Sequence, residues 1–167
     1  LVAILSPMFM KQIGRSKKSK DLYTAERIAT ACNVAFADNP GAYDAFMSFK
    51  GLSATVSATV NGETETYKVY LIAANESNPY NCFHGTDAGL GKSDGSTGFY
   101  GTVNEQLGLS TKKHNATIVP KYNKAKAGTR TRNKSGKMVT ENFGEIDNWR
   151  ICRREDGNME IWSSDHT

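Results

Sequence analysis

The amino-terminal end constrains the fold most, because it is too apolar to stay exposed to water and too short to cross a membrane. Eight of the first ten residues (LVAILSPMFM) are apolar, and only Ser6 and Pro7 interrupt them. A helix needs about 20 apolar residues to span a bilayer. We therefore predict that this stretch ends a longer apolar segment starting ahead of Leu1, and that another surface covers it. The alternative is a short buried element.

Helical periodicity follows this apolar end, after a short basic stretch. Small and apolar residues recur there at steps of three and four: Ala25, Ile28, Ala29, Cys32, Ala35 and Phe36. This spacing puts them on one face of a helix and leaves polar residues on the other. The sequence DNPG at 38–41 ends the pattern, because proline cannot continue a helix. Residues 1–37 are thus predicted to form one long helix bent at Pro7, with an apolar end (1–13) and an amphipathic part (21–37).

Residues 38–167 are predicted to form a globular antiparallel β-domain. After a short helix or turn at 42–50, two β-rich runs at 53–60 and 63–73 flank Asn61-Gly62. Asn-Gly favours a two-residue hairpin turn, because both residues tolerate a positive φ. A closing hairpin is predicted from 147–154 and 158–163, around Glu155-Asp156-Gly157.

The part of the chain between the two hairpins is rich in glycine. We expect a loop at 75–110 with a short helical piece at 103–107, and an edge strand at 116–122 because of Pro120. The predicted fold is therefore α+β: a long N-terminal α-helix packed on a C-terminal antiparallel β-sheet.

Residues with reactive side chains form no recognisable catalytic or metal-binding pattern. Cys32, Cys82 and Cys152 are widely spaced, so one disulfide with a leftover thiol and three buried thiols both stay open. Cys82 and His84 would suit a small secreted enzyme only if the fold brought them together as nucleophile and base. Asp87 and Asp94 offer oxygen ligands for Ca²⁺, but their spacing does not fit an EF-hand. We expect no enzyme, no cofactor and no metal.

A basic segment at 111–140 is the most distinctive charge feature. It holds nine Lys or Arg and no Asp or Glu, whereas 141–167 hold seven acidic and three basic residues. Such a loop attracts nucleic acid through phosphate contacts, but Tyr122 is its one aromatic residue, and the net charge of +4 is mild. Solvent, or the acidic region of a neighbouring subunit, is the preferred partner. The basic residues are Lys112, Lys113, Lys121, Lys124, Lys126, Arg130, Arg132, Lys134 and Lys137.

The first 37 residues resemble the second half of the N-terminal segment of the type IV pilin family. In that family an apolar run (here LVAILSPMF at 1–9) passes through a proline into an amphipathic helix with basic and small residues. The family's most specific signature, a glycine before the cleavage point and a Phe-Thr-Leu-Ile-Glu-like start, would lie ahead of Leu1. The remaining residues agree with the family in architecture alone: helix, variable loop, antiparallel sheet and closing hairpin.

The resemblance implies a role for particular residues of the helix. Its apolar half would sit in the inner membrane before assembly and pack in a central helix bundle afterwards, with Pro7 at a bend. The bundle would be lined by Leu1, Val2, Ile4, Leu5, Met8, Phe9 and Ile13. The helix would be packed on the sheet by Leu22, Ile28, Cys32 and Phe36.

The resemblance also implies a structural role at the cell surface. The expected protein is a subunit of a type IV pilus or related filament, serving adhesion, twitching motility or DNA uptake. Its partners would be further copies of itself and the pilus assembly machinery. The alternatives are a pseudopilin of a type II secretion system and a membrane-anchored extracellular binding module whose helix is only a tether.

Overall fold

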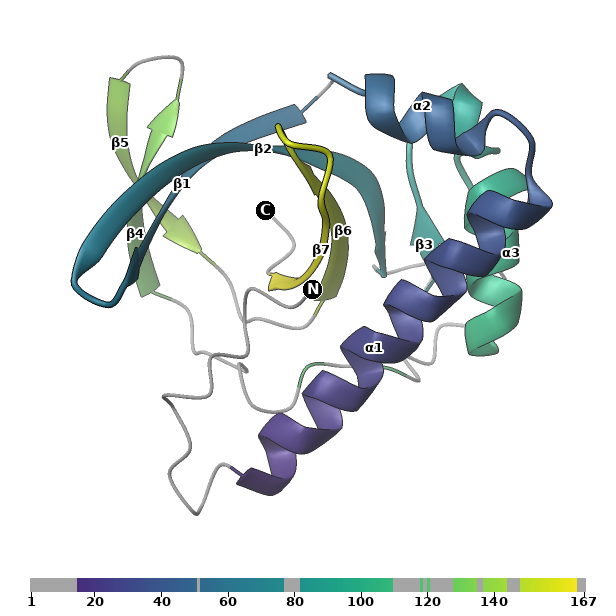
Figure 1. Cartoon of the computed structure of the whole chain (residues 1–167), viewed down its shortest axis with the longest axis horizontal. Coiled ribbons are helices and arrows are strands. Elements are labelled where there is room, and N and C mark those ends of the chain that lie inside the picture. The colour runs from purple at the N-terminus through teal and green to yellow at the C-terminus, as the bar shows by residue number, and fades with distance from the viewer. Residues whose placement is uncertain are drawn as a thin grey trace.

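The computed structural model describes residues 15–50, 52–76, 82–109, 118, 120, 128–134, 137–143 and 148–164. Three helices, α1 (Arg15–Asp38), α2 (Ala42–Ser48) and α3 (Gly98–Leu107), accompany seven strands (Figure 1). The strands are β1 (Leu52–Val60), β2 (Glu63–Glu76), β3 (Phe83–His84), β4 (Gly128–Lys134), β5 (Lys137–Phe143), β6 (Asn148–Arg154) and β7 (Met159–Ser164). The fold is mixed helix and antiparallel sheet, so the predicted α+β class is confirmed.

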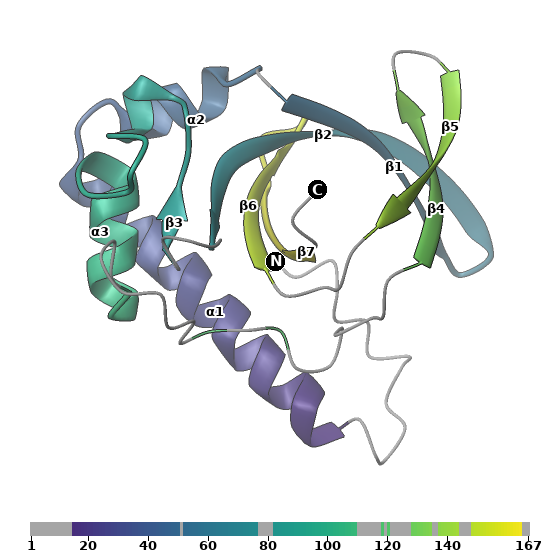
Figure 2. The ribbon, with the colours of Figure 1, turned by 180° about the vertical axis from the view of Figure 1, so that it is seen from behind.

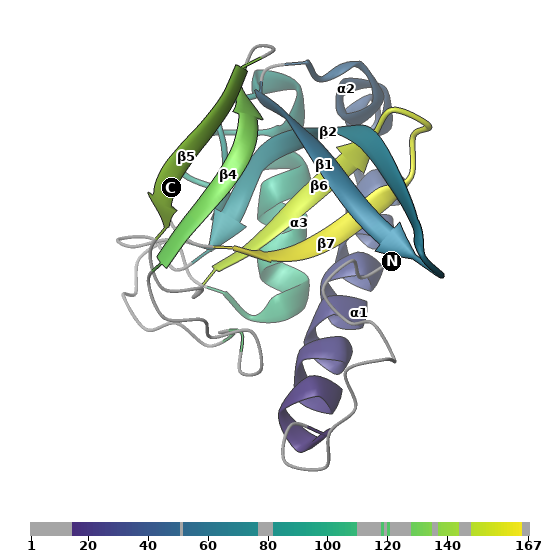
Figure 3. The ribbon, with the colours of Figure 1, turned by 90° about the vertical axis from the view of Figure 1, so that its left-hand side faces the viewer.

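One five-stranded sheet forms the β part of the domain. Its strand order is β1-β2-β6-β7, with the short β3 pairing the end of β2, and every pairing is antiparallel. Strands β1 and β2 are long and strongly curved (Figure 1). The β4–β5 hairpin forms a separate two-stranded sheet beside β1, as the rotated view in Figure 3 shows.

The first hairpin forms where Asn61-Gly62 predicts it. Both turn residues have positive φ, 53° for Asn61 and 83° for Gly62, as a type I′ turn requires. The pairing runs without a bulge from Val60↔Glu63 to Leu52↔Leu71. Since Ser53, Thr55, Thr66 and Lys68 are exposed and Val69 is fully buried, the pair has one polar face turned to water.

The closing hairpin also forms as predicted, but both faces of β6 are largely buried. Trp149, Ile151 and Arg153 share one face, opposite Ser163, Ile161 and Met159. Cys152, on the other face, is also fully buried, and its partner Glu160 is nearly so. Alternation alone predicts a solvated second face, so tertiary packing overrides the local pattern here.

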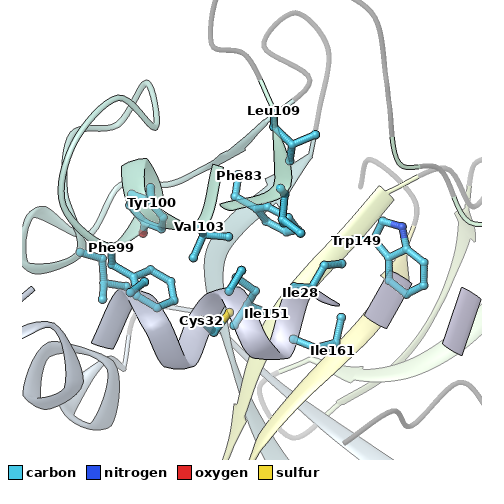
Figure 4. Packing of buried hydrophobic residues seen from close by; sticks show 14 of the residues in the cluster. Ile28, Cys32, Phe83, Phe99, Tyr100, Val103, Leu109, Trp149, Ile151 and Ile161 are labelled. Atoms are coloured by element: carbon cyan, nitrogen blue, oxygen red, sulfur yellow. The ribbon is translucent and has the colours of Figure 1, made fainter. Parts of the chain in front are cut away.

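Helices α1 and α3 lie side by side, with α2 near the carboxyl end of α1 (Figures 1 and 2). One cluster of buried hydrophobic residues contains members from the helices and from the strands. Ile28 and Cys32 of α1 belong to the same buried cluster as Ile151 of β6 and Ile161 of β7 (Figure 4). Val103 of α3 also belongs to this cluster.

Two predictions for the region between the hairpins need correction. The Gly-rich loop at 75–110 contains the end of β2, then β3, a 3₁₀ turn η3 (Ala88–Leu90) and the whole of α3, which starts five residues before the predicted helical piece. Part of the basic segment predicted as a loop forms β4 and β5 instead. In the predicted strand at 116–122, only Ile118 and Pro120 are described, and neither lies in a strand.

Candidate functional site

Helix α1 has one deeply buried face, built on a regular spacing. The five residues Ala25, Ile28, Ala31, Cys32 and Ala35 are each at most 2% exposed. Most of these side chains are small, so neighbouring elements can approach the helix closely. The same face continues toward the amino terminus with two charged residues, Lys18 and Asp21, which are also buried. The apolar pattern did not predict this charged extension.

The four residues predicted to pack the helix on the sheet lie in different environments. Ile28 and Cys32 are fully buried. Phe36 is half-buried, and its ring lies 5.1 Å from that of Phe46 in α2 and 4.8 Å from that of Phe99 in α3. Phe36 thus contacts an aromatic group on the helical side of the molecule. Leu22 is 38% exposed and does not belong to the buried face.

The opposite face of α1 borders an open groove between α1 and α3. The groove has a volume of about 330 Å³ and is lined by Tyr23, Glu26, Arg27, Thr30, Ala31, Gln106 and Leu107. Tyr23 is 63% exposed, and the Arg27 guanidinium carbon lies 5.8 Å from its ring centroid, within cation–π range. The groove offers one aromatic ring and both signs of charge, which suits an amphipathic partner better than a small substrate.

Sequence reasoning missed this groove, although it carried one usable signal. Tyr23 is a large aromatic residue on the polar side of the predicted helix, and such a residue often marks a contact surface. Gln106 and Leu107 lie far along the chain, so their approach to α1 depends on tertiary structure.

Cys82 and His84 lie in or beside the short strand β3 and differ in their burial. Cys82 is fully buried, and its thiol lies 3.7 Å from the backbone oxygen of Asp94, to which it can donate a weak hydrogen bond. His84 is half-buried, and burial lowers the pKa of its imidazole below the usual value. Reactive cysteines are usually accessible to solvent, whereas the Cys82 thiol is fully buried.

All three cysteines are buried as thiols, so the possible disulfide does not form. Burial raises the pKa of the Cys32 and Cys152 thiols well above their ordinary value. These cysteines therefore behave as small apolar core residues.

The two weak calcium candidates each stabilise a local turn. Asp87 Oδ1 accepts a hydrogen bond from Gly89 N at 2.8 Å, and Asp94 Oδ1 accepts one from Ser96 N at 2.9 Å. The hydrogen bonds from Ser96 lower the pKa of the Asp94 carboxyl. Within the described ranges, no three His, Cys, Asp or Glu residues come close enough to share a metal ion.

One buried amide holds the glycine-rich region together. Asn104 Oδ1 accepts a hydrogen bond from Phe83 N at 2.7 Å, while its Nδ2 donates to the oxygens of Phe83 and Gly95 at 2.8 and 3.0 Å. The sequence signal was an asparagine on the apolar face of α3, because a buried amide needs partners.

The basic segment is described only in part. Register pairs Arg130 with Glu141, Arg132 with Val139 and Lys134 with Lys137 across the β4–β5 hairpin. The remaining basic candidates, Lys112, Lys113, Lys121, Lys124 and Lys126, lie outside the described residues. So do the predicted bundle residues Leu1, Val2, Ile4, Leu5, Pro7, Met8, Phe9 and Ile13.

Comparison with known proteins gives no relative: no family profile, no curated protein and no solved structure matches the chain. Among the helices of the described ranges, none combines the length and the apolar character needed to cross a bilayer.

Proposed function

We propose that the chain is a filament subunit of the type IV pilus class, which assembles through its amino-terminal helix. The observation that carries the proposal is the direction of α1. Its amino-terminal turns extend past the sheet, α2 and α3 (Figures 1 and 3), and the apolar residues 1–13 come directly before them in the chain. A projecting helix preceded by an apolar segment suits burial among copies of itself.

The pilin-like arrangement, with the long helix packed on the sheet, is part of this proposal. It is supported by the shared burial of Ile28 and Cys32 with Ile151 and Ile161. The exposed Leu22 and Tyr23 support it too, because they leave apolar surface on α1 for a neighbouring subunit. The proposed location is the cell surface, after a stage in the inner membrane with the assembly machinery.

The test uses the complete product of the native gene in cells that possess a type IV assembly system. We expect filaments containing this chain in the sheared surface fraction, seen by immunogold electron microscopy. Leu5→Lys should abolish them, since a charge in a packed helix bundle is costly. Thr66→Lys, at an exposed site on β2, is the matched control and should leave assembly intact.

Three results would contradict the proposal, either in its class of protein or in its mode of assembly. Single copies at the cell surface with no filament would indicate a tethered binding module. Short filaments made only with a type II secretion system would indicate a pseudopilin. Normal assembly of the Leu5→Lys variant would contradict the role given to the apolar segment.

A further inference from the structure

The two outer strands of the five-stranded sheet are protected very differently. Strand β7 runs close to α1 and carries the nearly buried Glu160. Strand β1 (LSATVSATV) has no charged residue, no proline and no glycine, and all nine of its residues pair with β2 without a bulge. Proteins normally protect a long edge strand with at least one such device, because its backbone can pair with another chain.

The hairpin turn determines which backbone groups β1 presents at its open edge. In a two-residue type I′ hairpin, the residues flanking the turn exchange both backbone hydrogen bonds, here Val60 and Glu63. Bonded positions alternate along an antiparallel strand. The backbone N–H and C=O groups of Ser53, Thr55, Ser57 and Thr59 therefore point away from β2. Among the described strands, only β2 pairs with β1, although β4 passes nearby.

The sequence of β1 is almost a palindrome in residue type. When the strand is placed antiparallel to a copy of itself, with Val56 opposite Val56, Leu52 meets Val60 and Ala54 meets Ala58. In the same register Ser53 meets Thr59, and Thr55 meets Ser57. Aliphatic residues thus face aliphatic residues and hydroxyl residues face hydroxyl residues, pairings that stabilise antiparallel strands. In this register the backbone N–H and C=O groups that point away from β2 lie opposite the same groups of the second copy. They can therefore form hydrogen bonds between the two chains.

We propose that β1 is a self-pairing edge, which joins two copies of this chain across a two-fold axis into one continuous sheet. The occupant of the edge is β1 of the second copy. An interface of this isologous kind closes after two copies and does not propagate. It is therefore independent of filament growth through the amino-terminal helix, and it can pair free subunits or link subunits of two filaments.

The first test measures association of the full chain by sedimentation equilibrium. Dimers should form with rising concentration, and Thr55→Lys should raise the dimer dissociation constant at least about tenfold, because two like charges then meet near the axis. Thr66→Lys, at an exposed position on the inner strand β2, should leave the dimer dissociation constant unchanged. The same dimer should form in the Leu5→Lys background, which removes association through the apolar segment.

The second test checks the register by cross-linking. Val56→Cys should form an intermolecular disulfide under mild oxidation, since this residue faces its own copy, while the native thiols are buried. Ala58→Cys should not, because position 58 faces position 54 and lies about 13 Å along the strand from its own copy. The proposal is overturned if the chain stays monomeric at all concentrations, as it would if its own β4–β5 hairpin covers the edge. Equal cross-linking of both variants would also overturn it.

Discussion

The two long hairpins of the sheet, β1–β2 and β6–β7, share antiparallel pairing and a tight glycine-containing turn, but their surroundings are opposite. The β1–β2 pair exposes Ser53, Thr55, Thr66 and Lys68 on one face. The β6–β7 pair is largely buried on both faces, and the face with Ile151 and Ile161 belongs to the same buried cluster as Ile28 and Cys32 of α1 (Figure 4). Local turn chemistry therefore accounts for the register of the first hairpin, whereas the burial of the second depends on tertiary packing.

The largest expected effect tests this dependence in β6. Trp149 is fully buried, so Trp149→Ala should lower the free energy of unfolding by about 4 kcal/mol through lost contacts and a cavity. Among the residues that the structure describes, none accepts a hydrogen bond from its indole Nε1. Trp149→Phe should therefore restore much of the loss, because it keeps a buried ring and removes an unsatisfied donor. Denaturant unfolding monitored by circular dichroism measures both variants.

The control for this substitution lies on the exposed hairpin. Thr55→Val, which keeps β-branching, should change the free energy of unfolding by less than about 0.5 kcal/mol. If Thr55→Val and Trp149→Ala had similar effects, the contrast between the two hairpins would be wrong.

The second prediction compares the two turns through their glycines. Gly62 has φ +83° with open space where a Cβ would lie. Gly62→Ala should therefore lower the free energy of unfolding by about 1 kcal/mol, from backbone strain alone. Gly157 has φ +87°, but an added Cβ would lie 2.7 Å from Met47 Cε. Gly157→Ala should therefore cost more than Gly62→Ala, though only modestly so, since the end of a methionine side chain can move.

Unfolding free energies of the two alanine variants check this order, with Gly108→Ala as a third case. Gly108 also has a positive φ, +68°, and open space, and it lies at the end of α3 outside both hairpins. Gly108→Ala should lower the free energy of unfolding by about as much as Gly62→Ala. If Gly62→Ala lowered the free energy of unfolding more than Gly157→Ala, the closer packing inferred around the second turn would be wrong.

The comparison also explains how much of the fold could be predicted. The β1–β2 hairpin was predictable because Asn61-Gly62 and the alternating residues around it are local signals. The burial of Cys152 and Glu160 was not, because alternation describes one strand and not what covers its second face. The sequence of β4 (GTRTRNK) predicts a loop because it lacks apolar alternation, and its pairing with β5 gives it order instead.

In the candidate site, too, local features could be predicted from the sequence, whereas features that depend on tertiary contacts could not. Helical spacing alone identified the buried face at Ile28 and Cys32. The groove at Tyr23 and Arg27 needed the approach of α3, a contact between residues distant in sequence. Leu22 does not belong to that spacing and was assigned to sheet packing through the family resemblance alone; it is 38% exposed and lies off the buried face.

The smallest expected effect concerns the far end of β2, where Asn75 pairs with His84 of β3. Burial lowers the pKa of His84 in the folded chain, whereas the unfolded value is about 6.5. The unfolded state then binds more protons than the folded state as pH falls below about 6.5, so folding stability should decrease there and be fully present above it. His84→Gln should flatten this part of the pH profile, by less than the glycine effects because the imidazole is half-exposed. Thermal unfolding of both proteins between about pH 7.5 and 5 measures the difference, and an unchanged slope in the variant would mean that another group titrates.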